Sequence, residues 1–240
     1  MKLRLSDTLN SLMLGGLLMA STFASADNKP TKPYWQDVQV VAVNKEYPRS
    51  SFMTYENRAN ALTGKFEKSK YYQLLNGTWK FYFVDSYKNL PANITDHAIS
   101  TADWADIKVP GNWEVQGHGV AIYTNHGYEF QPRNPQPPTL PEANPVGVYR
   151  RDGRDIYLYL AGAKSGVYVY INGQEVGYSE DSKNSAEFLI NKFVKPGKNV
   201  LTLKIYRWST GSYLECQDFW RISGIERDVF LYSQPKAALK

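Results

Sequence analysis

The sequence is poor in residues that support disulfide or metal chemistry. It has one cysteine, Cys216, and three histidines among 240 residues. A single cysteine excludes an intramolecular disulfide, so a hydrophobic core must stabilise the fold. Only His118 and His126 lie near one another, and neither has a cysteine or histidine at the spacing of a zinc site. We therefore expect loop histidines that form local hydrogen bonds, the alternative being a metal site completed by nearby carboxylates.

The sequence also lacks concentrated positive charge and the common catalytic motifs. Its 28 lysines and arginines and 23 acidic residues give a net charge of +5, without a basic run. Nucleic-acid binding needs a concentrated basic face, so we exclude nucleic acid as a partner. No glycine-rich phosphate loop, Gly-x-Ser-x-Gly elbow or His-Glu-x-x-His motif is present. The chain therefore shows no catalytic motif of these classes.

The one long apolar run lies at the N-terminus and predicts export. Lys2 and Arg4 precede an apolar stretch at 12–20, and Ala24-Ser25-Ala26 forms a small-x-small cleavage site. A membrane-spanning helix needs about 20 apolar residues, so the alternative of an uncleaved anchor is disfavoured. We predict a signal peptide at 1–26 and a secreted or periplasmic protein that does not span the membrane.

The aromatic residues, with 6 Trp, 18 Tyr and 10 Phe, follow the alternation of β-strands. Strands are predicted at 77–84, 155–160, 200–206 and 227–232, and Asn172-Gly173 predicts a hairpin between 167–171 and 174–178. No long helical period is present. We predict an all-β sandwich or jelly roll at 51–240, preceded by an extended arm at 27–50.

Two loops are candidates for function. Residues 130–146 hold six of the 13 prolines, and so long a loop is usually functional or disordered. Residues 213–220 (YLECQDFW) set acidic side chains among aromatic ones, which suits sugar hydroxyls and an apolar sugar face. Retaining glycosidases use two carboxyl groups about 5 Å apart. Spacing alone favours a different interpretation, a structural carboxylate paired with Arg207 or Arg221.

Several longer motifs carry a family resemblance. The motifs are NKEYPR at 44–49, LNGTWKF at 75–81, VPGNWE at 109–114, IYTN at 122–125, NPVG at 144–147, GYSEDS at 177–182, and RWSTGSY at 207–213 continuing to Val229. With these motifs the chain resembles the N-terminal sugar-binding domain of β-galactosidases in glycoside hydrolase family 2, over nearly everything after Tyr34.

The resemblance implies a jelly-roll, galactose-binding-like β-sandwich that packs against a (β/α)8 barrel. In the family the barrel carries both catalytic glutamates and a magnesium ion, so no catalytic residue or cofactor is expected within this chain. By motif position, Asn125 approaches the substrate, and Asp218 binds galactose hydroxyls and shares a sodium ion with the barrel. Trp220 is a weaker candidate for substrate binding, as is Trp113, since either can be a core residue.

Two departures from the family pattern lead to further expectations. The chain ends at Lys240, without a match to the barrel's glutamate motifs, and we expect it to be inactive alone. At Asp152 the family's next strand and turn are missing, about 5–8 residues. We expect this loss to expose strand edges and destabilise the domain.

Three functions remain open. The chain is the sugar-binding domain of a β-galactosidase, a lectin-like carbohydrate-binding module, or a fragment that complements a separately encoded barrel. All three take galactosides as ligands.

Overall fold

The computed structural model describes residues 32–131, 133–153 and 157–234, and the predicted signal peptide lies outside them. Within these residues the chain is nearly all β, with a single short α-helix, α1 (Arg58–Leu62). None of the described helices has the length and apolar character needed to cross a membrane. The all-β prediction is confirmed.

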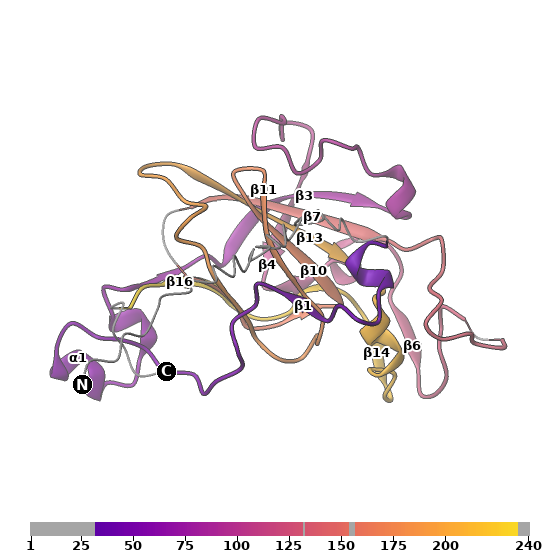
Figure 1. Ribbon diagram of the computed structural model, residues 1–240, viewed down its shortest axis with the longest axis horizontal. Helices are drawn as coiled ribbons and strands as arrows, with labels where there is room; N and C mark the ends of the chain where they lie inside the picture. The colour runs from indigo at the N-terminus through magenta and orange to yellow at the C-terminus, as the bar shows by residue number, and fades with distance from the viewer. Residues whose placement is uncertain (1–31, 132, 154–156, 235–240) are drawn as a thin grey trace, which may run out of the picture. The chain divides into compact units, whose positions relative to one another are not determined.

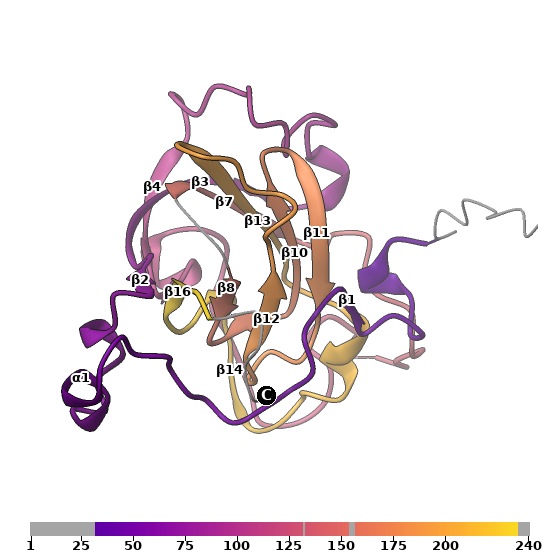
Figure 2. The same cartoon turned by 60° about the vertical axis from the view of Figure 1, so that its left-hand side comes forward.

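Most strands belong to two antiparallel sheets. The larger, among the described residues, has the order β1-β11-β10-β13-β7-β3-β4, and Figure 2 shows these strands side by side. The smaller has the order β12-β8-β16-β2. The strands of the larger sheet are β1 (Ala42–Val43), β3 (Gly77–Val84), β4 (Ala105–Val109), β7 (Val146–Gly153), β10 (Gly166–Ile171), β11 (Gln174–Ser179) and β13 (Asn199–Tyr206). Those of the smaller are β2 (Tyr72–Leu74), β8 (Tyr157–Leu160), β12 (Ala186–Leu189) and β16 (Val229–Tyr232).

The remaining elements are short. Strands β5 (Gly111–Asn112), β9 (Ala163–Lys164) and β15 (Gly224–Ile225) form a small three-stranded sheet, and β6 (Ile122–Thr124) pairs with β14 (Phe219–Arg221). The 3-10 helices are η1 (Tyr34–Gln36), η2 (Phe66–Lys68), η3 (Tyr87–Asn89), η4 (Glu114–Gln116) and η5 (Thr210–Tyr213).

The hydrophobic core lies between the two large sheets. Trp79 and Phe81 of β3 and Leu203 of β13 meet Leu158 and Leu160 of β8, and all five are buried. They recur at every second position, as the pleat requires when one face of a strand is buried. Burying each side chain stabilises the fold by about 1.5–3 kcal/mol. The core is therefore that of a jelly-roll β-sandwich, as predicted.

The predicted hairpin is confirmed as β10 and β11. Asn172 and Gly173 form the turn with φ angles of 53° and 83°. Only Asn, Asp and Gly adopt such positive angles readily, so the Asn-Gly pair fixes the turn. The rings of Tyr168 and Tyr178, one on each strand, form a tilted aromatic pair with centroids 4.6 Å apart and an angle of 52° between their planes.

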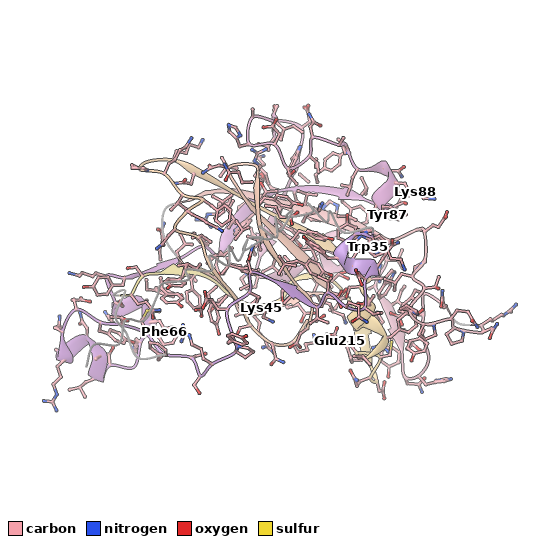
Figure 3. The ribbon with its side chains drawn as sticks, viewed as in Figure 1. Trp35, Lys45, Phe66, Tyr87, Lys88 and Glu215 are labelled. Atoms are coloured by element: carbon pink, nitrogen blue, oxygen red, sulfur yellow. The ribbon has the colours of Figure 1, made fainter. Side chains whose placement is uncertain are left out.

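The segment predicted as an extended arm packs onto the larger sheet. Trp35 of η1 is fully buried, and its ring stacks on Tyr206 of β13 with centroids 5.0 Å apart. Tyr87 lies against the same indole, as the labelled side chains in Figure 3 show. Further along the arm, β1 pairs with β11 and extends the sheet by one strand. The described part of the arm is thus integrated into the packing of the domain.

The short junction at Asp152 separates two strands of different sheets. The β3–β7 ladder ends at the pair Lys80 and Arg150, whereas β7 stays paired with β13 as far as Gly153. After the junction, β8 is paired on both sides, by β12 and β16. Residues 154–156 lie outside the described residues, so the loss of a strand stays a prediction. Among the described residues, the last three of β7 pair with β13 and have no pairing partner on β3.

Candidate functional site

The predicted site residues meet on a two-stranded ribbon, which we call the β6–β14 ribbon (Figure 1). In its antiparallel register Thr124 pairs with Phe219 and Tyr123 pairs with Trp220. Asn125 directly follows β6, and Asp218 directly precedes β14. Both residues therefore stand at the same end of the ribbon, although they are far apart in the sequence.

The Asp218 carboxylate lies beside two exposed aromatic rings. The Tyr123 hydroxyl donates a hydrogen bond of 2.7 Å to Asp218 Oδ1, and this bond raises the pKa of Tyr123. The rings of Tyr123 and Trp220 lie 5.4 Å apart, and the two residues are 55% and 54% exposed. Exposed aromatic residues that combine an apolar body with a polar tip are suited to binding sites. The ribbon thus offers a hydrogen-bond acceptor next to apolar ring surface.

Asn125 is held by its neighbour in the loop after β6. His126 Nδ1 lies 2.6 Å from Asn125 Oδ1, and Thr124 Oγ1 donates to the backbone carbonyl of His126. The other loop histidine, His118, packs edge-on against Phe81 at 4.8 Å, and burial lowers its pKa. The expected local hydrogen bond is confirmed for His126, whereas the contact found for His118 is the packing of its ring on Phe81 of β3.

The two tryptophan candidates have different environments. Trp113 is fully buried in the core, where its ring packs on Gly147 of β7. A Cβ at Gly147 would lie 2.6 Å from two carbons of this ring, so the indole requires glycine there. Trp220 projects from the ribbon and is exposed. Trp113 is therefore a core residue, and Trp220 remains the candidate for ligand contact.

The carboxylates of 213–220 do not pair with the two arginines as spacing suggested. Arg207 instead lies 3.7 Å from Glu114, and Arg221 lies 3.1 Å from Glu129. Glu215 accepts hydrogen bonds from the backbone nitrogen and the hydroxyl of Ser182, at 2.8 and 2.5 Å. Figure 3 labels Glu215 in the segment before β14. The expected pairing of a carboxylate in 213–220 with Arg207 or Arg221 was therefore wrong. The Asp218 carboxylate instead lies beside the Tyr123 hydroxyl.

Sequence reasoning missed three residues that shape this region. Tyr123 is the direct partner of Asp218, while Glu114 and Glu129 balance the two buried arginines. Tyr123 lies within the IYTN motif, beside Asn125, and its alternation with Ile122 and Thr124 is the signal that was available. Glu114 and Glu129 gave no such signal, because their partners are far away in the sequence.

The proline-rich loop packs against the segment that leads to Asp218. Tyr213 donates a hydrogen bond of 2.8 Å to Gln131, and the Phe130 ring lies 5.0 Å from that of Trp208. Asn144 at the other end of the loop donates to the backbone carbonyl of Trp208 and is fully buried. The described part of the loop is ordered by these contacts, and it supports the approach to β14.

A cation at Asp218 needs ligands beyond this carboxylate. In the part of the chain that the structure describes, no group of three or more His, Cys, Asp or Glu residues is arranged to hold a metal ion. Asp218 Oδ1 already accepts from Tyr123. Hard cations take about six oxygen ligands, so a sodium ion here requires carbonyl oxygens, water or groups from another domain. By itself, the Asp218 carboxylate would supply only one part of such a ligand set, so the shared sodium site stays a prediction.

Comparison with known proteins identifies the family. Residues 72–235 match the family described as "Glycosyl hydrolases family 2, sugar binding domain". The chain belongs to glycoside hydrolase family 2. All three predicted site residues and the whole β6–β14 ribbon fall within the matched range.

Similar proteins are larger enzymes. The chain is 38% identical over 215 residues to a β-galactosidase of Priestia megaterium, covering 85% of this chain and 21% of that protein. It is 38% identical over 213 residues to a β-galactosidase of Actinobacillus pleuropneumoniae, covering 86% of this chain and 20% of that protein. The chain thus spans about a fifth of the length of these relatives.

Solved structures support the fold. A β-glucuronidase from Ruminococcus gnavus, in complex with D-glucaro-d-lactam, matches with a TM-score of 0.51 and 17% identity, covering 70% of this chain and 30% of that one. A Bifidobacterium dentium β-glucuronidase, complexed with coumarin-3-O-glucuronide, matches with a TM-score of 0.50 and 18% identity, covering 67% and 29%. At this level of identity the likeness concerns the fold alone.

Proposed function

We propose that the β6–β14 ribbon binds terminal β-galactosides and that the chain is the sugar-binding part of a β-galactosidase. The observation that supports this best is the meeting of Asn125 and Asp218 at one end of the ribbon, beside the exposed Trp220. Asp218 accepts hydrogen bonds from sugar hydroxyls, Asn125 hydrogen-bonds through its amide, and Trp220 offers apolar surface to the sugar ring. The β-galactosidase relatives make a galactoside the first ligand to test.

The chain alone does not hydrolyse galactosides in this proposal. Retaining glycosidases need an acid/base and a nucleophile, two carboxyl groups about 5 Å apart across the scissile bond. Among the described residues, Asp218 is hydrogen-bonded to a phenol, and no described contact joins it to a second carboxylate. A carboxylate that only binds hydroxyls stabilises substrate and transition state alike, and so contributes little to rate.

A second candidate is complementation of a separately encoded catalytic barrel. Tyr123 and Trp220 on the ribbon, and Val120 just before β6, are exposed apolar side chains that a partner domain would cover. Galactosidase activity that appears only on mixing the chain with such a barrel would support this function. A Trp220→Asp variant should then fail to restore activity.

We further propose export of the protein by its N-terminal segment, to a secreted or periplasmic location. Expression of the complete chain in a bacterium, followed by fractionation and N-terminal sequencing, tests this. The expected product begins at Asp27 outside the cytoplasm. Retention of Met1 in a cytoplasmic product contradicts export.

The sugar-binding proposal is tested by titrating the protein with methyl β-galactoside and following the backbone amide signals by NMR. An open site on one domain predicts weak binding, with a Kd of about 1–10 mM. The shifts should be largest for Asp218, Trp220 and Asn125. Methyl β-glucoside, which differs only at the C4 hydroxyl, is the control. Shifts scattered over the sandwich, or none at all, contradict the proposal.

A further inference from the structure

The β6–β14 ribbon is too short to be stable by its own pairing. Each strand has three residues, and the ribbon belongs to neither of the large sheets. An isolated two-stranded hairpin is only marginally stable in water. Its exposed rings add little burial. The geometry of Asp218 and Asn125 must therefore be set by contacts that the ribbon makes with the rest of the domain.

Arg207 joins both strands of the ribbon to the larger sheet. It directly follows β13, and it is only 4% exposed. One guanidinium nitrogen, Nη2, donates to the backbone carbonyls of Val120 at 2.9 Å and Arg221 at 2.8 Å. Val120 lies just before β6 and Arg221 ends β14. A single side chain thus bridges the two strands at the end opposite Asp218.

Arg221 holds the backbone on both sides of Asp218. Its guanidinium folds back along β14, where Nη1 donates to the carbonyls of Gln217 at 2.6 Å and Phe219 at 3.2 Å. Nε donates to Glu129 at 3.1 Å, and the residue is 2% exposed. Because these carbonyls flank Asp218, the arginine restricts the direction in which its carboxylate points.

Each buried arginine has a carboxylate nearby to offset its charge. Glu114 Oε2 accepts from the backbone nitrogen of Ser223, and Glu114 lies 3.7 Å from Arg207 through its other oxygen. Glu129 fills the same role for Arg221. Hydrogen bonds from charged groups strengthen in a buried setting of low dielectric. Both arginines therefore form a polar connection from the core to the ribbon.

We propose that Arg207 and Arg221 are positioning residues that hold Asp218 and Asn125 in the arrangement that binds the galactoside. This rests on the proposed sugar-binding function. The planar guanidinium is essential to the role, because its fixed fork of donors reaches several carbonyls at once. A lysine in its place keeps the positive charge but lacks this fork.

The experiment uses the full chain and three variants, Arg207→Lys, Arg221→Lys and the matched control Arg150→Lys. Arg150 is also buried, and it also donates to two backbone carbonyls, those of His97 and Ile99. Amide hydrogen exchange is measured in the ribbon (122–124 and 219–221) and in β10 and β13. The Kd for methyl β-galactoside is measured for each protein.

Arg207→Lys and Arg221→Lys are expected to speed exchange in the ribbon about tenfold, leave β10 and β13 protected, and raise the Kd about tenfold. Arg150→Lys should leave the ribbon and the Kd unchanged. The proposal is overturned if the ribbon amides of both arginine variants exchange as slowly as those of the wild-type protein. A loss of protection that is equal in ribbon and core for both variants overturns it as well. If the wild-type protein binds no galactoside, the sugar-binding function fails, while the exchange data still decide whether the arginines hold the ribbon.

Discussion

The sandwich core and the β6–β14 ribbon are held in different ways. The core is stabilised by apolar side chains that alternate along long strands, such as Trp79, Phe81 and Leu203. The ribbon has three residues per strand and is tied to the domain by hydrogen bonds from Arg207 and Arg221. Stability is thus concentrated in the core, while the ribbon presents exposed polar and aromatic groups. Substitutions in the core should therefore lower the free energy of unfolding, whereas substitutions in the ribbon should mainly weaken sugar binding.

The largest expected effect is on the core. Trp79→Ala removes a buried indole that also donates a hydrogen bond to the carbonyl of Leu75. Replacing a buried aromatic residue with alanine costs about 3–5 kcal/mol, a large part of the stability of a typical domain. Urea denaturation followed by circular dichroism measures the loss. A change below about 1 kcal/mol would show that the region between the sheets is not the main source of stability.

The next largest effect is on binding. Asp218→Ala should raise the Kd for methyl β-galactoside at least about thirtyfold, because it removes the charged acceptor for sugar hydroxyls. Asp218 is on the ribbon, so the free energy of unfolding should change by less than about 0.5 kcal/mol. Calorimetric titration and urea denaturation of the same sample separate the two effects. An unchanged Kd removes Asp218 from the site.

A smaller effect is expected on the pH dependence of stability. Burial lowers the pKa of Lys164 to about 8, and among the described residues its Nζ has no hydrogen-bond partner. Between pH 8 and the ordinary pKa of 10.5, the unfolded chain binds more protons than the folded one. Stability therefore rises with pH across this window, and the penalty for burying the charge is complete below pH 8.

Lys164→Met should remove the part of this rise that Lys164 contributes, which we expect to amount to about 1–2 kcal/mol after the contact of Nζ with the Phe219 ring, 4.2 Å from its centroid, is allowed for. Urea denaturation at pH 7, 8, 9 and 10 measures it. Lys204→Met is the matched variant, because burial also lowers the pKa of Lys204 to about 8. An unaltered slope in Lys164→Met means that the folded protein keeps this amine protonated.

The smallest effect is expected for Tyr123→Phe. The change removes the hydroxyl that donates to Asp218 and keeps the ring beside Trp220. Loss of a single hydrogen bond at an exposed site is worth about 0.5–1 kcal/mol, so the Kd should rise about two- to fivefold. NMR titration is sensitive enough to detect it. Tighter binding would show instead that Tyr123 competes with the sugar for the carboxylate.

The fold was largely predictable because local patterns agree with the packing. The alternation of Trp79 and Phe81 and the Asn172-Gly173 turn each specify a strand or a turn from a few neighbouring residues. The polar layer beneath the ribbon was not predictable in this way. Arg207 contacts Val120, and Arg221 contacts Glu129, through pairings that depend on the tertiary fold.

The candidate site was only partly accessible from the sequence. Asn125, Asp218 and Trp220 were predicted from motif position, and the antiparallel register of β6 and β14 then places them together. Tyr123 was missed because an exposed tyrosine within a strand does not by itself indicate a partner. Its hydrogen bond to Asp218 depends on which strand pairs with β6, and a three-residue strand gives almost no signal for that choice.

The most direct test of the account is a thermal melt of the purified protein with and without excess galactose, for wild type and Asp218→Ala. A ligand that binds only the folded state stabilises it by an amount that grows with concentration over Kd. We predict one cooperative transition, whose midpoint temperature galactose raises in the wild type and leaves unchanged in Asp218→Ala. A cooperative transition that galactose does not move, or moves equally in both proteins, would contradict sugar binding at the ribbon.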